Sequence, residues 1–253
     1  MRPLCRISSA GLLLLSLVSA GCATSHGASS HDAAVAHAPA SDAPGLAPTP
    51  DPLAGWEKIR DEDGIVVHRK EIEGSPLVAF RGEGIVAAPI AEVALVQMDL
   101  AHTPEWIERL KDARVLEVTS DTRFVTYSHL GAPILVSDRD FVNEVNIEYS
   151  PPSKIVFHIH GVESDKAPSK GNVRGVLMHS RFELTAVEGG STRVVCEIHA
   201  DPKGLLPKSV VNLFQRGWAY KTLTHMREQV KRPDVVERAP EIKALLERNG
   251  FRF

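Results

Sequence analysis

Apolar and polar residues alternate with a period of two over most of the chain from residue 115 to residue 200, which is typical of strands with one buried and one wet face. Short turn-forming segments separate six such stretches, and this order predicts an antiparallel meander. The predicted strands are residues 115–119, 123–130, 141–149, 154–161, 173–184 and 192–200.

The pattern differs on the N-terminal side of this meander. Strand-like pieces lie on both sides of a turn at residues 62–64, and residues 77–86 form another predicted strand. Helical spacing follows from Pro89. Thr103 is a capping residue before a first-turn proline, so a second short helix is expected to run from there to about Leu110.

Residues 205–231 form the long helical stretch of the second half of the chain. Pro207 fits the first turn, where a missing N–H group costs nothing, and Pro233 cannot continue the helix. Apolar residues spread round much of its circumference, so the helix needs a large concave partner. The meander supplies that partner if its apolar face wraps round the helix. The prediction is an α+β helix-grip fold, in which a curved antiparallel sheet and the long helix enclose a hydrophobic cavity.

The N-terminus has the features of a secretory signal. Arg2 and Arg6 precede the apolar residues 11–20, a run too short to span a membrane. The small residues before Cys22 resemble a bacterial lipobox, so residues 1–21 are predicted to be a lipoprotein signal peptide and Cys22 to carry acyl chains. Ala23 follows the cysteine, and in Gram-negative bacteria this resemblance implies the periplasmic face of the outer membrane.

One position departs from the lipobox pattern. Ser19 stands where leucine is usual, so ordinary cleavage and a secreted or periplasmic protein remain open. Residues 22–54 contain almost no large apolar side chain and are expected to be a disordered tether. The folded domain is expected at residues 55–232, followed by a tail at 233–253 with a short helix at 241–248.

Composition narrows the choice of partners. A net charge of −3 gives no basic surface for nucleic acid. Two of the three cysteines, Cys5 and Cys22, lie in the leader, so Cys196 is expected to be a buried apolar residue rather than part of a disulfide framework. We expect no cofactor, no metal and a monomer. His158 and His160 alternate along a strand as two metal ligands would, but they lie opposite apolar residues and favour the solvent face.

Several motifs give the fold a family resemblance. A proline-containing loop leads into Arg139-Asp140-Phe141, Trp106 follows the first helix, and residues 201–207 lead into the last helix. Residues 56–232 resemble the START family of lipid-transfer domains in these motifs and in the order of elements. The resemblance implies a hydrophobic tunnel that holds one lipid, roofed by the last helix and by the loop at 132–138.

The resemblance also implies which residues line the cavity, and this chain departs from the sterol-carrying members at one position. Sterol-carrying members resemble each other in an arginine six residues after the motif arginine, paired with a carboxylate on the preceding strand. Here Val145 takes that position, and the preceding strand offers Thr126 and Ser128, so an acyl chain or another apolar compound is favoured over a sterol. The residues expected to line the cavity or its lid are Asn143, Val145, Phe157, Met178, Phe182, Val210, Phe214, Gly217 and Trp218.

The expected function is binding, and transfer, of a lipid or other hydrophobic ligand at the bacterial envelope, without catalysis. Two alternatives stay open: an enzyme related to polyketide cyclases and hydrolases, with acid–base chemistry by His129 or Tyr127, and a structural lipoprotein without a cavity. Arg139 and Asp140 are expected to form a structural ion pair or cap, although binding of a lipid head group is a second possibility.

Overall fold

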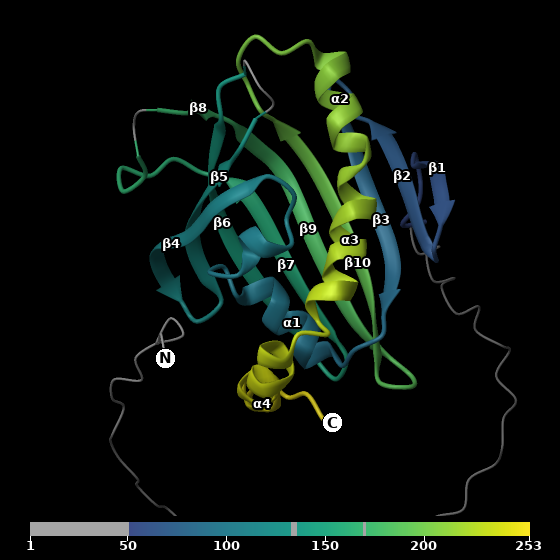
Figure 1. The fold of residues 1–253 in the computed structure, drawn as a ribbon. Coiled ribbons are helices and arrows are strands. Elements are labelled where there is room, and N and C mark those ends of the chain that lie inside the picture. The colour runs from purple at the N-terminus through teal and green to yellow at the C-terminus, as the bar shows by residue number, and fades with distance from the viewer. Residues whose placement is uncertain (1–50, 133–135, 169–170) are drawn as a thin grey trace, which may run out of the picture. The chain divides into compact units, whose positions relative to one another are not determined.

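The computed structural model describes residues 51–132, 136–168 and 171–253 (Figure 1). The predictions for the signal peptide, Cys22 and most of the tether fall on residues 1–50 and therefore lie outside the described residues. Part of the predicted roof, residues 133–135, lies outside them as well. Within the described residues, no helix is both long and apolar enough to cross a membrane.

Nine strands form a continuous antiparallel sheet in the order β1-β2-β3-β10-β9-β7-β6-β5-β4, and the short β8 pairs in parallel with β6. Figure 1 shows the sheet curving round the α2–α3 segment. The bounds are β1 Glu57–Glu62, β2 Ile65–Glu71, β3 Val78–Val86, β4 Leu110–Ser120, β5 Arg123–Leu130, β6 Arg139–Ser150, β7 Lys154–Gly161, β8 Val173–Arg174, β9 Val176–Val187 and β10 Ser191–Asp201. The predicted α+β helix-grip fold is confirmed.

The helices cover the concave face and one end of the sheet (Figure 1). Their bounds are α1 Ile90–Met98, the 3₁₀ turn η1 Thr103–Glu105, α2 Lys208–Arg216, α3 Trp218–Gln229 and α4 Pro233–Arg248. The core forms where α3 meets the sheet. A Cβ atom at Gly82 of β3 would lie 2.8 Å from Cβ of Ala219, so only glycine permits this close approach.

The long helix predicted at residues 205–231 is two helices, because the regular pattern breaks at Gly217. Glycine is a poor helix former, and its flexible backbone makes a break at this position cheap. Of the α2 residues only Val211 is buried, whereas α3 buries Leu223 and Met226 completely. The two halves therefore differ greatly in how firmly they are held.

Other boundaries also differ from the pattern-based prediction. The helix predicted from Thr103 to Leu110 is only the short turn η1, since β4 already begins at Leu110. The strand predicted at 173–184 is divided into β8 and β9 at Gly175. A Cβ atom there would lie 2.4 Å from the Phe141 ring, so this position is a close crossing.

The C-terminal helix is longer than the predicted 241–248 segment. Pro233 does not mark the end of the preceding helix, which stops at Gln229. It occupies the first turn of α4, where a proline is tolerated. α4 packs against α1, and its buried side chains are Val235, Ala239, Ile242 and Leu246. Its Arg238 pairs with Asp99 just after α1, so α4 braces the segment that joins α1 to β4.

Candidate ligand cavity

A cavity of about 200 Å³ lies between the concave face of the sheet, the α1–η1 segment and the start of α3. Its walls come from α1 and the following loop, from η1, and from strands β4, β5, β6, β7 and β9. The lining residues are Gln97, Met98, Leu100, Thr103, Trp106, Ile107, Leu110, Ala113, Phe124, Thr126, Tyr127, Ser128, Leu130, Asn143, Val145, Phe157, Ile159, Leu177, Phe182 and Trp218.

Regular strand alternation brings the central lining residues together. Asn143 and Val145 of β6 and Phe157 of β7 are buried and point to the cavity side of the sheet. Phe182 and Trp218 form an edge-to-face pair, with ring centroids 6.0 Å apart, that closes the α3 side. The structure thus places these five predicted residues around one cavity.

The motif residue Trp106 also lines the cavity. Its carbonyl oxygen accepts a hydrogen bond from Nδ1 of His225 on α3 at 2.8 Å, and its side chain is buried. Met98, Leu100 and Ile107 of the neighbouring wall were not among the predicted cavity residues. Met98 is the last residue of α1, and the other two lie in the loops on either side of η1, where no strand alternation indicates which side chains face inward.

Three predicted lid residues on the last helix do not line the cavity. Val210 and Gly217 are half-buried, and 55% of Phe214 is exposed. The inner side of α2 instead makes two polar contacts with strand ends: Asn212 Oδ1 accepts a hydrogen bond from Val78 N at 3.1 Å, and Gln215 Nε2 donates to Ala200 O at 3.0 Å. Extrapolating the apolar stripe of α3 across the break at Gly217 is therefore wrong.

Met178 is a further correction. It is 37% exposed, and its neighbour Leu177 lines the cavity instead. The pairing of β9 with β10 shifts between His199 and Ala200, so β9 carries an extra residue at Met178. Such a bulge reverses the alternation of faces beyond it, and strict alternation assigned Met178 to the wrong side.

The residues of the Arg139-Asp140-Phe141 motif contact other parts of the fold. Both charged side chains are buried, but they do not pair with each other. Asp140 accepts a two-point contact from Arg174, at 2.6 and 3.2 Å. Arg139 donates to the carbonyl oxygens of Pro202 and Lys203, both at 3.3 Å, and so ties the start of β6 to the loop before α2. Phe141 packs against Gly175 outside the cavity.

The described part of the cavity lining is uncharged. None of its residues is acidic, basic or a histidine. Among the described lining residues only Tyr127 can ionise. Its hydroxyl lies 3.4 Å from Asn172 Nδ2, and burial followed by the charge of Asp140 raises its pKa. His129 binds Asp138 at 2.8 Å rather than facing the cavity. The two residues named for acid–base chemistry thus both contact other side chains.

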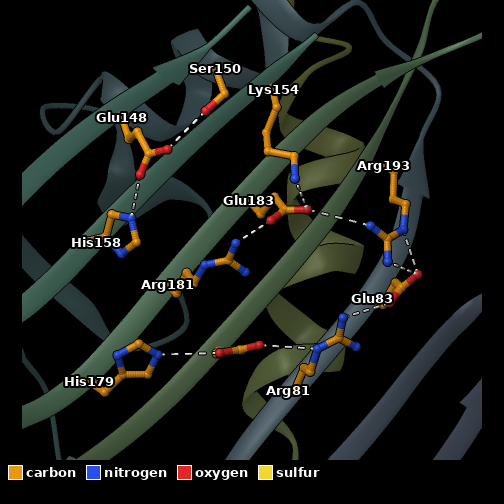
Figure 2. Close-up of polar contacts among 11 residues, drawn as sticks. Arg81, Glu83, Glu148, Ser150, Lys154, His158, His179, Arg181, Glu183 and Arg193 are labelled. Carbon is orange, nitrogen blue, oxygen red and sulfur yellow. Dashed lines mark hydrogen bonds and ion pairs between the residues drawn. The ribbon is translucent and has the colours of Figure 1, made fainter. Parts of the chain in front are cut away.

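The convex face of the sheet is covered by a network of alternating charges (Figure 2). Glu83 accepts contacts from Arg193 at 2.6 Å and Arg81 at 3.0 Å. His158 and His160 lie on this face and contact Glu148 and Glu144, at 3.4 and 3.5 Å. Among the described residues no group of three or more potential ligands could hold a metal ion.

Two buried histidines predict acid sensitivity. Burial, followed by the charge of Arg81, lowers the pKa of His68, and burial also lowers the pKa of His199. Because the unfolded chain takes up these protons near pH 6.5, the stabilisation is complete above pH 6.5 and is lost as the pH falls below it. Burial raises the pKa of Glu83, but Arg193 and Arg81 outweigh it and lower the pKa, so this second contribution is lost only below pH 4.5.

We therefore expect thermal melts to show a fall in Tm that begins near pH 6.5 and steepens below 4.5. The double variant His68→Gln/His199→Gln should show a smaller fall in Tm between pH 6.5 and 4.5 and an unchanged fall below pH 4.5. An unchanged profile in this variant would show that the two histidines contribute nothing to acid sensitivity.

Comparison with known proteins agrees with this architecture. The family model for the START domain matches residues 52–234. This chain belongs to the START domain family. The START match ends within the first turn of α4, so most of that helix lies beyond it.

Individual START relatives are similar to this chain over about two thirds of its length or slightly more. Human StAR-related lipid transfer protein 5 is 29% identical over 168 residues, which cover 64% of this chain and 79% of the relative. Its solved structure superposes with a TM-score of 0.64 at 26% identity and covers 70% of this chain and 87% of that chain. The STAR-related lipid transfer protein from Xanthomonas axonopodis superposes with a TM-score of 0.63 at 27% identity and covers 70% and 99%.

Proposed function

We propose that this START domain is a carrier that binds an apolar molecule in its internal cavity and exchanges it with a membrane. The observation that carries the proposal is the cavity itself, which is walled by aromatic and aliphatic side chains and contains no charged residue among those described. Relatives that are named lipid transfer proteins support it. We propose binding without catalysis, since His129 and the Tyr127 hydroxyl are held by other contacts.

The size of the cavity implies that its walls move. The cavity volume of about 200 Å³ is roughly that of seven water molecules, at ~30 Å³ each. It lies below the ~300–1,000 Å³ that is typical of ligand pockets. A whole lipid therefore needs a wider cavity. The α2 helix is the element best suited to move, because it has one buried residue and is joined to α3 through Gly217.

Exposed apolar side chains point to the contact with a membrane. Leu205 is fully exposed in the loop before α2, and Leu213 and Phe214 are exposed on α2 itself. Burying each in the apolar part of a bilayer would contribute ~1.5–3 kcal/mol. We propose that α2 touches the bilayer from which the ligand is taken.

Stiffening the break at Gly217 should slow exchange. The backbone there suits alanine, and an added Cβ atom would meet only Lys221 Cε, at an ordinary 3.7 Å. We expect Gly217→Ala to stabilise the fold by ~0.5–1 kcal/mol and to lower the rate of ligand transfer between vesicles. The control Ser209→Ala raises the helix propensity of α2 without altering the break and should leave the rate unchanged. A transfer rate in Gly217→Ala equal to that of the wild type would show that α2 is not the element that moves.

Native mass spectrometry of purified residues 51–253 tests the carrier function. We expect a fraction of the protein to carry an apolar molecule from the expression host, and organic extraction to release it for identification. Protein that is empty as isolated and takes up no fatty acid, phospholipid or long-chain alcohol would contradict the proposal.

For the location, we propose that Cys22 is acylated and anchors the domain at the periplasmic face of the outer membrane. The signal-like residues before Cys22 and the alanine after it support this proposal. Cells grown with a clickable fatty acid should label the full chain but not the Cys22→Ala variant. Equal labelling of the two, or none of the wild type, would leave a secreted or periplasmic protein as the alternative.

A further inference from the structure

Three residues that line the cavity each have a buried polar side-chain atom without a hydrogen-bond partner. These atoms are Nε1 of Trp106, Oδ1 of Asn143 and Oε1 of Gln97. The first two belong to side chains that are only 5% and 8% exposed. Buried polar groups in native proteins are nearly always paired, so three unpaired atoms around one cavity require an explanation.

Two hydroxyls of the same wall are already satisfied. The Thr126 hydroxyl donates to the backbone oxygen of Asn143 at 3.2 Å, and the Thr103 hydroxyl donates to the backbone oxygen of Asp99 at 3.1 Å. These two hydroxyls serve the local backbone, whereas the indole N–H and the two amide oxygens are left for another partner.

The chemistry of the unpaired groups defines their complement. An indole N–H only donates, whereas an amide oxygen only accepts. A group that satisfies both must accept a hydrogen bond from Trp106 and donate one to the side-chain oxygen of Asn143 or Gln97. Charge is disfavoured, because none of the described lining residues would compensate an ion for its lost hydration.

We propose that the cavity binds the polar end of its ligand, and that this end is an uncharged hydroxyl or amide on an otherwise apolar molecule. The inference rests on the proposed carrier function and specifies which apolar molecules are preferred. Trp106 donates to the ligand oxygen, and Asn143 faces the same group from β6.

The position of these residues is fixed from outside the cavity. Trp106 is held through its backbone by His225, and the neighbouring Glu105 accepts a hydrogen bond from Gln229 Nε2 at 3.2 Å. Asn143 lies in the middle of β6, with strands paired on both sides. The two walls are thus firm, and the polar end of the ligand would lie between them.

Calorimetric titration of residues 51–253 with three short probes tests the inference: 1-octanol, methyl octyl ether and octyl phosphate. The ether can accept a hydrogen bond but cannot donate one. We expect the alcohol to bind about tenfold more tightly than the ether, the difference that one good neutral hydrogen bond makes. Octyl phosphate should bind more weakly than either.

The matched variants are Asn143→Leu and Asn146→Leu on the same strand, since Asn146 is exposed on the opposite face. The first should abolish the preference for the alcohol while ether binding persists, and it should keep or raise Tm because it removes an unpaired buried amide. The second should change neither affinity. Trp106→Phe should instead weaken the binding of alcohol and ether alike, because the oxygen of either probe accepts the indole hydrogen bond.

The outcomes separate the two proposals. Equal binding of alcohol and ether, unaffected by Asn143→Leu, would overturn the polar site and leave the apolar carrier standing. Octyl phosphate binding as tightly as octanol would overturn the requirement for an uncharged group. A marked loss of Tm in Asn143→Leu would make the amide a structural group. Failure of all three probes to bind would contradict the polar site and the carrier function together.

Discussion

Replacing Ala113 with phenylalanine is expected to reduce ligand uptake by about tenfold or more. Ala113 lies on β4 and lines the cavity, so a larger side chain there enters the space that the ligand needs. Excluding even two methylene groups at ~0.8 kcal/mol each corresponds to about a tenfold loss of affinity. Titration with a fluorescent fatty acid measures the effect.

The control for this variant is Val118→Phe on the same strand, where the side chain is 49% exposed. It adds an aromatic ring without changing the cavity, so uptake should stay at the wild-type level. Uptake that survives in Ala113→Phe, or that falls equally in both variants, would show that ligand does not occupy this cavity. Circular dichroism melts identify any loss caused by unfolding.

The largest effect on stability is expected for Leu246→Ala in α4. Leu246 is completely buried in the core cluster that joins α4 to α1, and such truncations cost ~2–5 kcal/mol because they leave a cavity. Urea unfolding of residues 51–253 provides the measurement. The expected cost makes α4 part of the domain core, although most of it lies beyond the START match.

The control in the same helix is Val236→Ala, whose side chain is 52% exposed and should change stability by less than ~0.5 kcal/mol. Similar small effects of both substitutions would mean that α4 is only loosely attached. In that case it could not brace the α1–β4 segment, and the contact between Arg238 and Asp99 would be incidental.

The part of the site that follows regular alternation could be predicted from the sequence. β6 pairs with β5 and β7 without any shift in register, so the faces of Asn143, Val145 and Phe157 follow directly from a period of two. Likewise, six alternating strands followed by an apolar helix restrict the architecture to a sheet wrapped round a helix.

The prediction failed where the period was interrupted. The bulge at Met178 is a single extra residue that leaves no trace in the pattern, and it turned one predicted residue away from the cavity. The helix is interrupted at Gly217. The spacing of four residues between Phe214 and Trp218 therefore does not put both side chains on the same buried face. The part of the wall that follows α1 lies in the loops round η1, where tertiary contacts and not periodicity decide which side chains face inward.

The most direct test of the central claim, that the cavity is the ligand site, is the position of a heavy atom on a bound chain. Crystals of residues 51–253 grown with 8-bromo-1-octanol should give an anomalous bromine peak among the apolar lining residues, such as Phe157, Phe182 and Trp218. A peak found only beside the exposed Leu213 and Phe214, with none in the cavity, would contradict the account.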